Sequence, residues 1–279
     1  MIIDSHQHFW RKTQEDVDRG PGSRSYSYLP DQLEPILHEH SINKTIAVQA
    51  SPSLEENEFL LQIAKTRKEV IGVVGWVELD DRQALQTLDM YKENPHFVGI
   101  RPMIQDLPSE WLLKSTVIHN LSKLADENFP IDLQANPRHL PVIIEILDKM
   151  PHLHCVIDHI AKPPIDTREM EPWASHMRKI AEYPNIMCKI SGLVPEKVGA
   201  RWTTKSILPY VELVLDIFGP KRIMFGSDWP VCLKSASYSE AVQLFEDTVT
   251  DRLSSRERED VYYNNAKRFY RLEDTLQRK

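Results

Sequence analysis

The chain has 279 residues, 41% of them hydrophobic and 27% charged, which is typical of a globular protein large enough to bury its own core. Its formal net charge of −7 at pH 7 lacks the basic excess that nucleic-acid binding needs, so we expect no nucleic-acid partner. No apolar run approaches the roughly 20 residues that span a bilayer, and the N-terminus lacks the pattern of a signal peptide, so we expect no membrane partner. Three widely spaced cysteines without a CxxC pair argue against a cysteine zinc site and a disulfide framework, which favours a cytoplasmic protein.

Eight short apolar runs of strand-like composition follow one another along the chain. They span residues 2–9, 44–50, 70–79, 97–104, 130–135, 154–160, 186–193 and 222–229. Their spacing of roughly 25–40 residues leaves room for one crossover helix in each gap, which is what parallel strands require.

Helical patterns fill these gaps. Residues 30–42 begin with a proline and an aspartate, which suit a helix start, and Ser53 stands three residues before Glu56 as in a capping box. Residues 137–151 carry a stripe of apolar side chains, and residues 206–219 end in a glycine followed by a proline. An amphipathic segment, 254–272, predicts a C-terminal helix.

Eight strand–helix units in a chain of this length predict an α/β fold, a single (β/α)8 TIM barrel over residues 1–279 with a C-terminal helix. The rival, a doubly wound open sheet, is disfavoured because no G-x-G-x-x-G follows an early strand and the chain holds only 9 glycines. The long irregular segment 11–29 follows the first strand, so we expect it to form a rim or lid at the active-site face.

Polar side chains gather at the predicted carboxyl ends of the strands, where barrels of this type carry their chemistry. The first strand ends in His6 and His8, which share a face by the two-residue period, with Asp4 expected below them. The sixth ends in His159 and the eighth in Asp228. Each has a plain alternative, since strand histidines are often structural and an aspartate often caps a helix. Their coincidence at one end of one barrel favours a catalytic group.

Two further strands end in Arg101 and Gln134. Arg101 alone is also consistent with a buried ion pair to Asp106 or Glu78.

Several motifs occur in one order from residue 2 to about 272, namely DSHQHFW, GIRPMIQ, VIDHIAKPPI, CKISGL, FGSDWPV and NNAKRFYRL. Together they resemble the lactonase branch of the amidohydrolase superfamily, which includes fuconolactonase-like and rhamnonolactonase-like enzymes and a pyrone dicarboxylate lactonase. The resemblance implies the same (β/α)8 barrel. It also implies catalytic roles for His6, His8, His159 and Asp228, and, by a looser match, substrate binding by Arg101 and Gln134.

The positions of Arg101 and Gln134 depart from the two-metal members of the superfamily, which carry metal ligands there. A guanidinium stays protonated and cannot ligate a cation, so a two-metal site is not expected. Two possibilities stay open: no obligatory metal, or one divalent cation, zinc being the best match, held by His6, His8 and Asp228.

The resemblance predicts hydrolysis of a sugar-acid lactone. Asp228 would take a proton from the attacking water, while His6, His8 and His159 polarise the carbonyl or hold a metal. One inward arginine suits a neutral sugar lactone better than a dicarboxylate, although Arg138 and Arg201 could supply more positive charge.

Tryptophans at or just past strand ends are predicted to contact the sugar, namely Trp10, Trp76 and Trp229; simple rim packing is the alternative. Lys189 is expected to form a structural ion pair or a substrate hydrogen bond, and Lys162 to be a solvated loop charge unless it reaches the substrate.

Two other function classes stay open. One is a zinc-dependent decarboxylase or a dicarboxylate (pyrone) lactonase of the same superfamily, and the other is a non-catalytic barrel that binds sugars.

Overall fold

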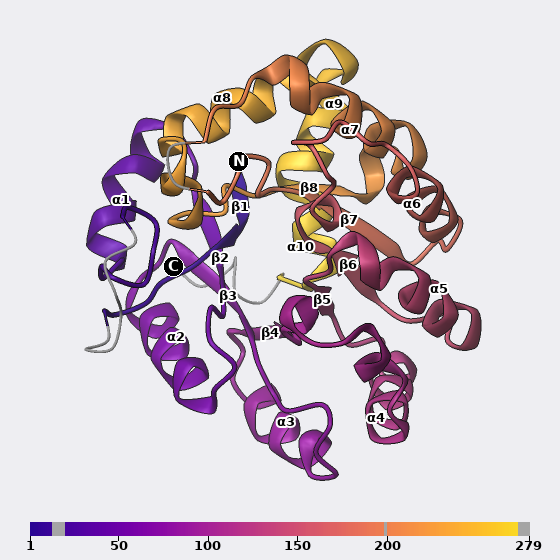
Figure 1. The fold of residues 1–279 in the computed structure, drawn as a ribbon. Coiled ribbons are helices and arrows are strands. Elements are labelled where there is room, and N and C mark those ends of the chain that lie inside the picture. Colours follow the sequence, from indigo (N-terminus) through magenta and orange to yellow (C-terminus); the bar gives the residue numbers. More distant parts are fainter. Residues whose placement is uncertain (13–19, 198–199, 273–279) are drawn as a thin grey trace.

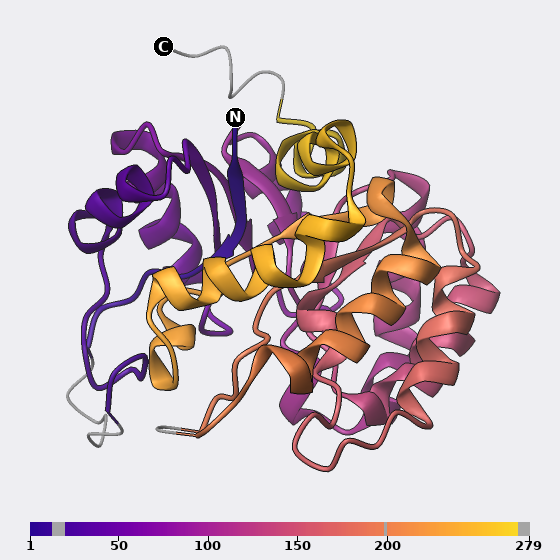
Figure 2. The same ribbon diagram turned by 90° about the horizontal axis from the view of Figure 1, so that it is seen from above.

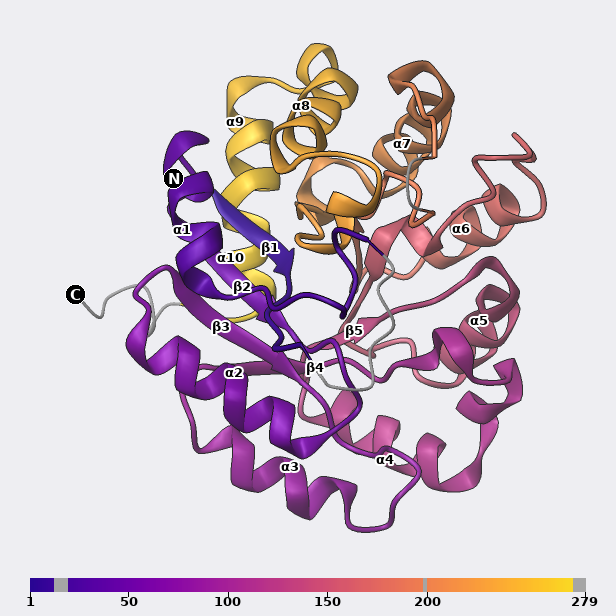
Figure 3. The same cartoon turned by 60° about the vertical axis from the view of Figure 1, so that its left-hand side comes forward.

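The computed structural model describes residues 1–12, 20–197 and 200–272. Eight parallel strands pair in chain order from β1 to β8, and helices surround them (Figures 1 and 3). A parallel bridge between Gln7 and Trp229 joins the last strand to the first and closes the barrel. The predicted (β/α)8 barrel is confirmed. Among the described residues, no helix has both the length and the apolar character needed to cross a membrane.

All eight predicted strands are present, although each is shorter than the apolar run that predicted it. They are β1 Ile3–Gln7, β2 Lys44–Val48, β3 Val70–Gly75, β4 Phe97–Ile100, β5 Ile131–Leu133, β6 Cys155–Ile157, β7 Ile186–Ile190 and β8 Ile223–Phe225. The runs extended further because the loops that leave the strands are themselves buried, so they carry the apolar residues of a strand without its pairing.

The helices occupy the predicted gaps. Their bounds are α1 Pro30–Glu39, α2 Leu54–Thr66, α3 Ala84–Lys92, α4 Ser115–Asp126, α5 Leu140–Lys149, α6 Trp173–Ala181, α7 Thr204–Phe218, α8 Tyr238–Val249, α9 Ser255–Glu259 and α10 Asn265–Phe269. A π-helical turn, Asp260–Asn264, joins α9 to α10. The predicted C-terminal helix is therefore continuous in space but changes its hydrogen-bond register once.

The C-terminal helix covers the bottom of the barrel. Phe269, Tyr270 and Leu272 join one apolar cluster with inward side chains of β1, β2, β3, β4, β6, β7 and β8. The cluster includes Ile3 and Met224, which lie at or near the starts of their strands. Figure 2 shows this helix, in yellow, at the end of the barrel where β1 begins. The opposite end, where the strands stop, is left for the loops.

The start of α2 ties down a loop at the open end. Ser53 caps the helix by accepting a hydrogen bond from the Glu56 backbone N–H, as predicted. The Glu56 carboxylate does not complete a capping box. It accepts instead from the backbone N–H groups of Ala50 and Ser51, and it faces Arg24 at 3.5 Å. One buried carboxylate thus fixes the turn after β2 to the long first loop.

One prediction about side-chain orientation is wrong. Asp4 was expected beneath His6 and His8, but a register irregularity between Asp4 and Gln7 alters the alternation along β1. The Asp4 carboxylate accepts hydrogen bonds from the Tyr238 hydroxyl of α8 at 3.0 Å and from the Ser227 backbone N–H at 2.9 Å. Burial raises its pKa despite those bonds.

Gly226, just after β8, is expected to be essential for the open end of the barrel. A methyl group there would lie 2.7 Å from His6 Cβ and 3.0 Å from Ser191 Cβ. Gly226→Ala should therefore cost about 1–3 kcal/mol of folding free energy by overpacking and also displace His6. Urea unfolding would measure the first effect, and the NMR chemical shifts of the His6 ring would measure the second.

The matched control is Gly219→Ala. Gly219 has φ 68° and ψ 163°, and no atom would lie within 4 Å of an added methyl group. That backbone strain should also cost about 1–3 kcal/mol but leave the site intact. A His6 ring signal displaced no more in Gly226→Ala than in Gly219→Ala would contradict the packing argument.

Candidate active site

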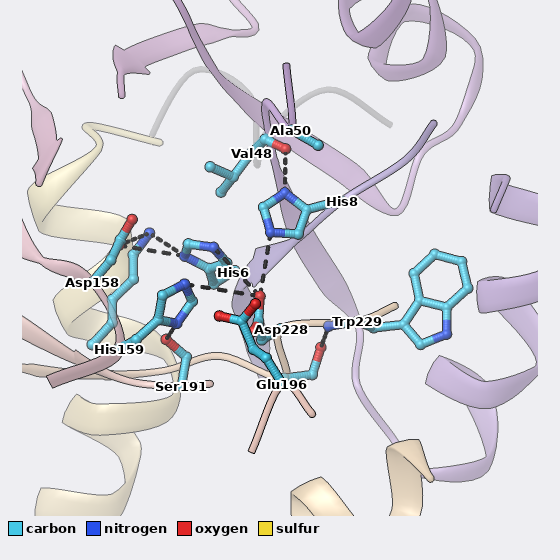
Figure 4. A network of polar contacts seen from close by, with 12 residues as sticks. His6, His8, Val48, Ala50, Asp158, His159, Ser191, Glu196, Asp228 and Trp229 are labelled. Atoms are coloured by element: carbon cyan, nitrogen blue, oxygen red, sulfur yellow. Dashed lines mark hydrogen bonds and ion pairs between the residues drawn. The ribbon is translucent and has the colours of Figure 1, made fainter. Parts of the chain in front are cut away.

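Three histidine rings converge on one carboxylate oxygen at the open end of the barrel (Figure 4). His6 and His8 come from the end of β1, His159 follows β6, and Asp228 follows β8. The distances from Asp228 Oδ1 to the Nε2 atoms are 3.9 Å for His6, 3.3 Å for His8 and 3.9 Å for His159. All four side chains are nearly inaccessible to solvent. The structure therefore brings together the four residues that the sequence singled out.

Each ring is oriented through its other nitrogen. His8 Nδ1 lies 2.7 Å from the Val48 carbonyl, and His159 Nδ1 lies 2.9 Å from Ser191 Oγ. A carbonyl can only accept, so His8 donates from Nδ1 and a neutral ring turns its Nε2 lone pair toward Asp228. A lone pair facing a carboxylate at 3.3 Å is repulsive unless a proton or a metal cation lies between them.

The backbone that carries His159 is unusual. His159, Ile160, Ala161 and Lys162 all have positive φ, between 47° and 59°, which side-chain-bearing residues seldom adopt. The turn is held by the Trp173 indole, which donates to the Ile160 carbonyl at 2.9 Å. Gly192 packs against the imidazole so closely that a methyl group there would lie 2.5 Å from His159 Nδ1. Strain of this kind persists where the surroundings impose it, and functional sites are where it clusters.

Burial sets the protonation states of this group. It lowers the pKa of His6 well below the ordinary value, and the cationic Lys189 lowers it further. Burial likewise lowers the pKa of His159 well below the ordinary value, although Asp228 opposes the shift. Burial by itself would raise the pKa of Asp228, but His159 and His8 hold it below its usual range. His6 and His159 are therefore neutral, and Asp228 is ionised, at neutral pH.

The donor set fits a divalent cation. Ligand atoms of His6, His159 and Asp228 lie within 4.8 Å of one another, and His8 Nε2 also faces Asp228 Oδ1. The separations of 3.3–3.9 Å compare with about 3.3 Å between ligands of a tetrahedral zinc. The sequence placed His8 in the ligand set and left His159 nearby, whereas the described geometry groups His159 with His6 and Asp228.

A cavity of about 530 Å³ opens above this centre. Among the predicted substrate-binding residues, Arg101, Gln134 and Trp10 line it. Gln134 Oε1 is buried and has no hydrogen-bond partner among the described residues, so it is available to a ligand. Arg101 does not pair with Asp106 or Glu78. Its guanidinium lies 3.3 Å from His6 Nε2 and 3.7 Å from Asp158 Oδ2.

Two of the predicted tryptophans do not line the cavity. Trp229 is 1% exposed and packs edge-on against Phe9 and Tyr28, with its ring pointing away from the histidines (Figure 4). Trp76 follows β3, and its backbone is bonded to the Asn57 amide side chain. A position just past a strand end did not show which way these rings point: Trp229 packs into the protein, and Trp76 is half-buried outside the cavity lining.

The described part of the first loop forms the predicted rim. Gly22, Ser23, Arg24 and Ser25 line the cavity, while Trp10 pairs with Tyr28 through two backbone hydrogen bonds of 3.0 and 2.9 Å. Residues 13–19 of the same predicted segment lie outside the described residues.

Sequence reasoning missed a polar wall of the cavity that adjoins this rim. Glu196, from the loop after β7, faces Lys162 at 2.5 Å and Lys234 at 3.2 Å, and Lys162 also donates to Gln105 at 2.9 Å. All four residues line the cavity, so Lys162 is a paired wall residue and not a solvated charge. The only signal for them was their place in segments that follow strands.

Comparison with known proteins identifies the family. The amidohydrolase family profile matches residues 3–272. The chain belongs to the amidohydrolase family.

Among relatives of this amidohydrolase is an L-fucono-1,5-lactonase of Burkholderia ambifaria, 35% identical, with 97% of this chain and 96% of the relative aligned. An amidohydrolase of Burkholderia multivorans, solved with bound zinc, superposes with a TM-score of 0.90 at 33% identity and covers 97% of this chain and 99% of its own. An L-rhamnono-gamma-lactonase of Scheffersomyces stipitis is 27% identical over 62% of this chain and 59% of its own.

The histidine pKa values make a prediction about stability. The unfolded chain protonates His6 and His159 near the ordinary value of 6.5, whereas the folded chain keeps them neutral. Acid therefore favours unfolding, so chelator-treated protein should lose stability as the pH falls from about 7 to about 5.5. Urea midpoints across that interval measure the loss. The His6→Gln/His159→Gln double variant should lose less, and an equal loss would contradict the assignment.

Proposed function

We propose that this amidohydrolase opens the ring of a sugar-acid lactone by hydrolysis. The observation that carries the proposal is the convergence of three imidazole nitrogens on the ionised Asp228 at the floor of a polar cavity. The L-fucono-1,5-lactonase relative, aligned over nearly the whole of both chains, supports the same reaction class.

Asp228 is the group that handles the proton. Its described contacts with the histidines all involve Oδ1, so Oδ2 would take the proton from the attacking water. The water oxygen bonds to the lactone carbonyl carbon, and the ring C–O bond then breaks. Asp228 returns the proton to the departing alkoxide, so the enzyme ends in its starting state. A carboxylate ionised at neutral pH is in the right form to begin this cycle.

The imidazoles and Arg101 polarise the lactone carbonyl and stabilise the charge that develops on its oxygen. The Arg101 guanidinium lies beside His6 Nε2, so its positive charge faces the place where the carbonyl oxygen gains negative charge. A divalent cation held by His6, His159 and Asp228, with His8 beside them, would add Lewis-acid polarisation of the carbonyl. We propose zinc as that cation because the donors are nitrogen and oxygen and because the Burkholderia multivorans relative holds zinc.

The cavity favours a neutral polyhydroxylated ring over a dicarboxylate. Its two arginines already have partners, because Arg24 donates to the Ala50 carbonyl at 2.7 Å and Arg101 faces Asp158. Arg138 bonds the backbone of Gln105 and does not line the cavity, and neither does Arg201. Lys162 and Lys234 also line the cavity, but both face Glu196, and Asp228 adds a negative charge. Trp10, also in the lining, offers an aromatic edge to the C–H face of a sugar.

The alternatives have weaker support. A dihydroxybenzoic acid decarboxylase of Polaromonas superposes with a TM-score of 0.72 at 16% identity, which shows a shared fold alone. Sugar binding without catalysis would not need three imidazoles on one carboxylate.

A pH-indicator screen of aldonolactones tests the proposal. We expect turnover of a sugar lactone such as L-fucono-1,5-lactone, with loss of activity after chelation and recovery on adding zinc. Stabilisation by lactones without acid release would favour a binding protein. Release of carbon dioxide from a hydroxybenzoate, with no lactone turnover, would favour a decarboxylase.

Substitution of the proposed base tests the mechanism. Asp228→Asn should lower kcat by about 10²–10⁴-fold on the best lactone, because the amide cannot accept the proton. The control, Asp166→Asn, alters a carboxylate in the loop after β6 that does not line the cavity, and it should keep nearly full activity. Asp228→Asn enzyme within tenfold of the wild type would rule out Asp228 as the base.

A further inference from the structure

A second group of potential cation ligands lies deeper in the barrel, below the histidine centre. It consists of His6, Asp132 of β5 and Asp158, which follows β6, and their ligand atoms lie within 4.8 Å of one another. All three side chains are fully buried. Two carboxylates in a site without solvent need positive charge close by, since isolated buried charges are costly.

That positive charge is the Lys189 ammonium of β7, which is itself fully buried. Its Nζ lies 2.5 Å from Asp132 Oδ2, 3.3 Å from Asp158 Oδ1 and 3.2 Å from His6 Nδ1. An ammonium has three N–H donors and no acceptor, and it lies against a carboxylate on two sides with the His6 ring as its third neighbour. The members of the second ligand group are therefore the partners of one lysine.

We infer that the Lys189 ammonium occupies what would otherwise be a second divalent-cation site, and that from there it positions His6 through Asp158. A metal ion needs deprotonated nitrogen and oxygen ligands, and here those ligands already surround a cation supplied by the chain.

The contacts of Asp158 support the second part of the inference, that Lys189 positions His6. Its Oδ1 lies 3.3 Å from Lys189 Nζ and 3.4 Å from His6 Nδ1, so the ammonium holds the carboxylate beside the imidazole. With Nδ1 fixed in this way, His6 turns Nε2 toward Asp228. Carboxylates behind a metal-binding histidine set its orientation and basicity. Lys189 is therefore a positioning residue that touches no substrate.

Tyr270, which follows α10, provides a matched control on the far side of the same network. Its hydroxyl donates to Asp132 Oδ1 at 2.7 Å, whereas Lys189 contacts the other carboxylate oxygen, Oδ2. Removing that hydroxyl weakens the network without removing the ammonium or disturbing Asp158.

The first experiment counts metal ions. Full-length wild type and Lys189→Ala are stripped with chelator, dialysed against manganese(II), and analysed for manganese per chain. We expect Lys189→Ala to hold one ion more than the wild type, and its thermal midpoint to respond more strongly to the metal. Lys189→Met removes the charge but fills the space, so it should hold no extra ion. A folded Lys189→Ala protein with wild-type stoichiometry overturns the inference.

The second experiment covers the case in which Lys189→Ala does not fold. The double variant Asp132→Asn/Lys189→Met removes one charge of each sign and so keeps the network balanced. We expect its zinc affinity, measured by competition with a chromogenic chelator, to fall by about 10–100-fold. Tyr270→Phe should lose stability but stay within about twofold of the wild-type affinity. Wild-type affinity in the double variant overturns the positioning role.

The positioning role of Lys189 rests on the metal in the proposed function. The extra ion expected in Lys189→Ala is counted relative to the wild type, so that result does not depend on the proposed function. A wild type that binds no zinc would contradict the metal assignment alone, and the manganese count would still decide whether Lys189 replaces a cation.

Discussion

Burial of charge inside a closed barrel is the constraint on which the rest of this structure depends. Asp132, Asp158 and Asp228 lie where the strands leave almost no access to water, and each faces cations or imidazoles. Removing one partner from such a group leaves an uncompensated buried charge, which typically costs about 3–5 kcal/mol. Loss of any one partner is therefore costly, and the network joins the ends of β1, β5, β6, β7 and β8 around the site.

The same constraint separates two layers with different tasks. In the lower layer the Lys189 side chain lies between two carboxylates, and burial raises the pKa of Asp132 to about 6 although Lys189 opposes the shift. In the upper layer Asp228 faces three imidazoles, and Arg101 lies beside them. His6 belongs to both layers, with Nδ1 on the lower and Nε2 on the upper. The lower layer therefore fixes the His6 ring, and the Nε2 atom of that ring faces the reaction site.

Sequence patterns predicted the fold and the four central residues because both depend on local regularities. Strand spacing requires crossover helices, and polar residues at strand ends of a parallel barrel share one face. The patterns did not predict which buried charged side chains pair with one another. Asp158 stood beside His159 in the chain without an assigned role, because its pairing with Lys189 and Arg101 depends on strands far apart in sequence. Trp229 was assigned to the mouth because nothing local shows that its ring turns into the core.

The loops at the mouth are joined to one another independently of the centre below them. Burial disfavours the charge on Glu196, yet Lys162 and Lys234 lower the pKa of Glu196 to about 2, so it stays ionised and keeps both lysines in place. Together with Gln105 this row connects the loops that follow β4, β6, β7 and β8. Because these contacts involve neither Asp228 nor the imidazoles, the shape of the cavity wall can change while the reacting group keeps its geometry. Substrate choice in this barrel is therefore a property of the loop contacts, and the reaction class is a property of the buried strand ends.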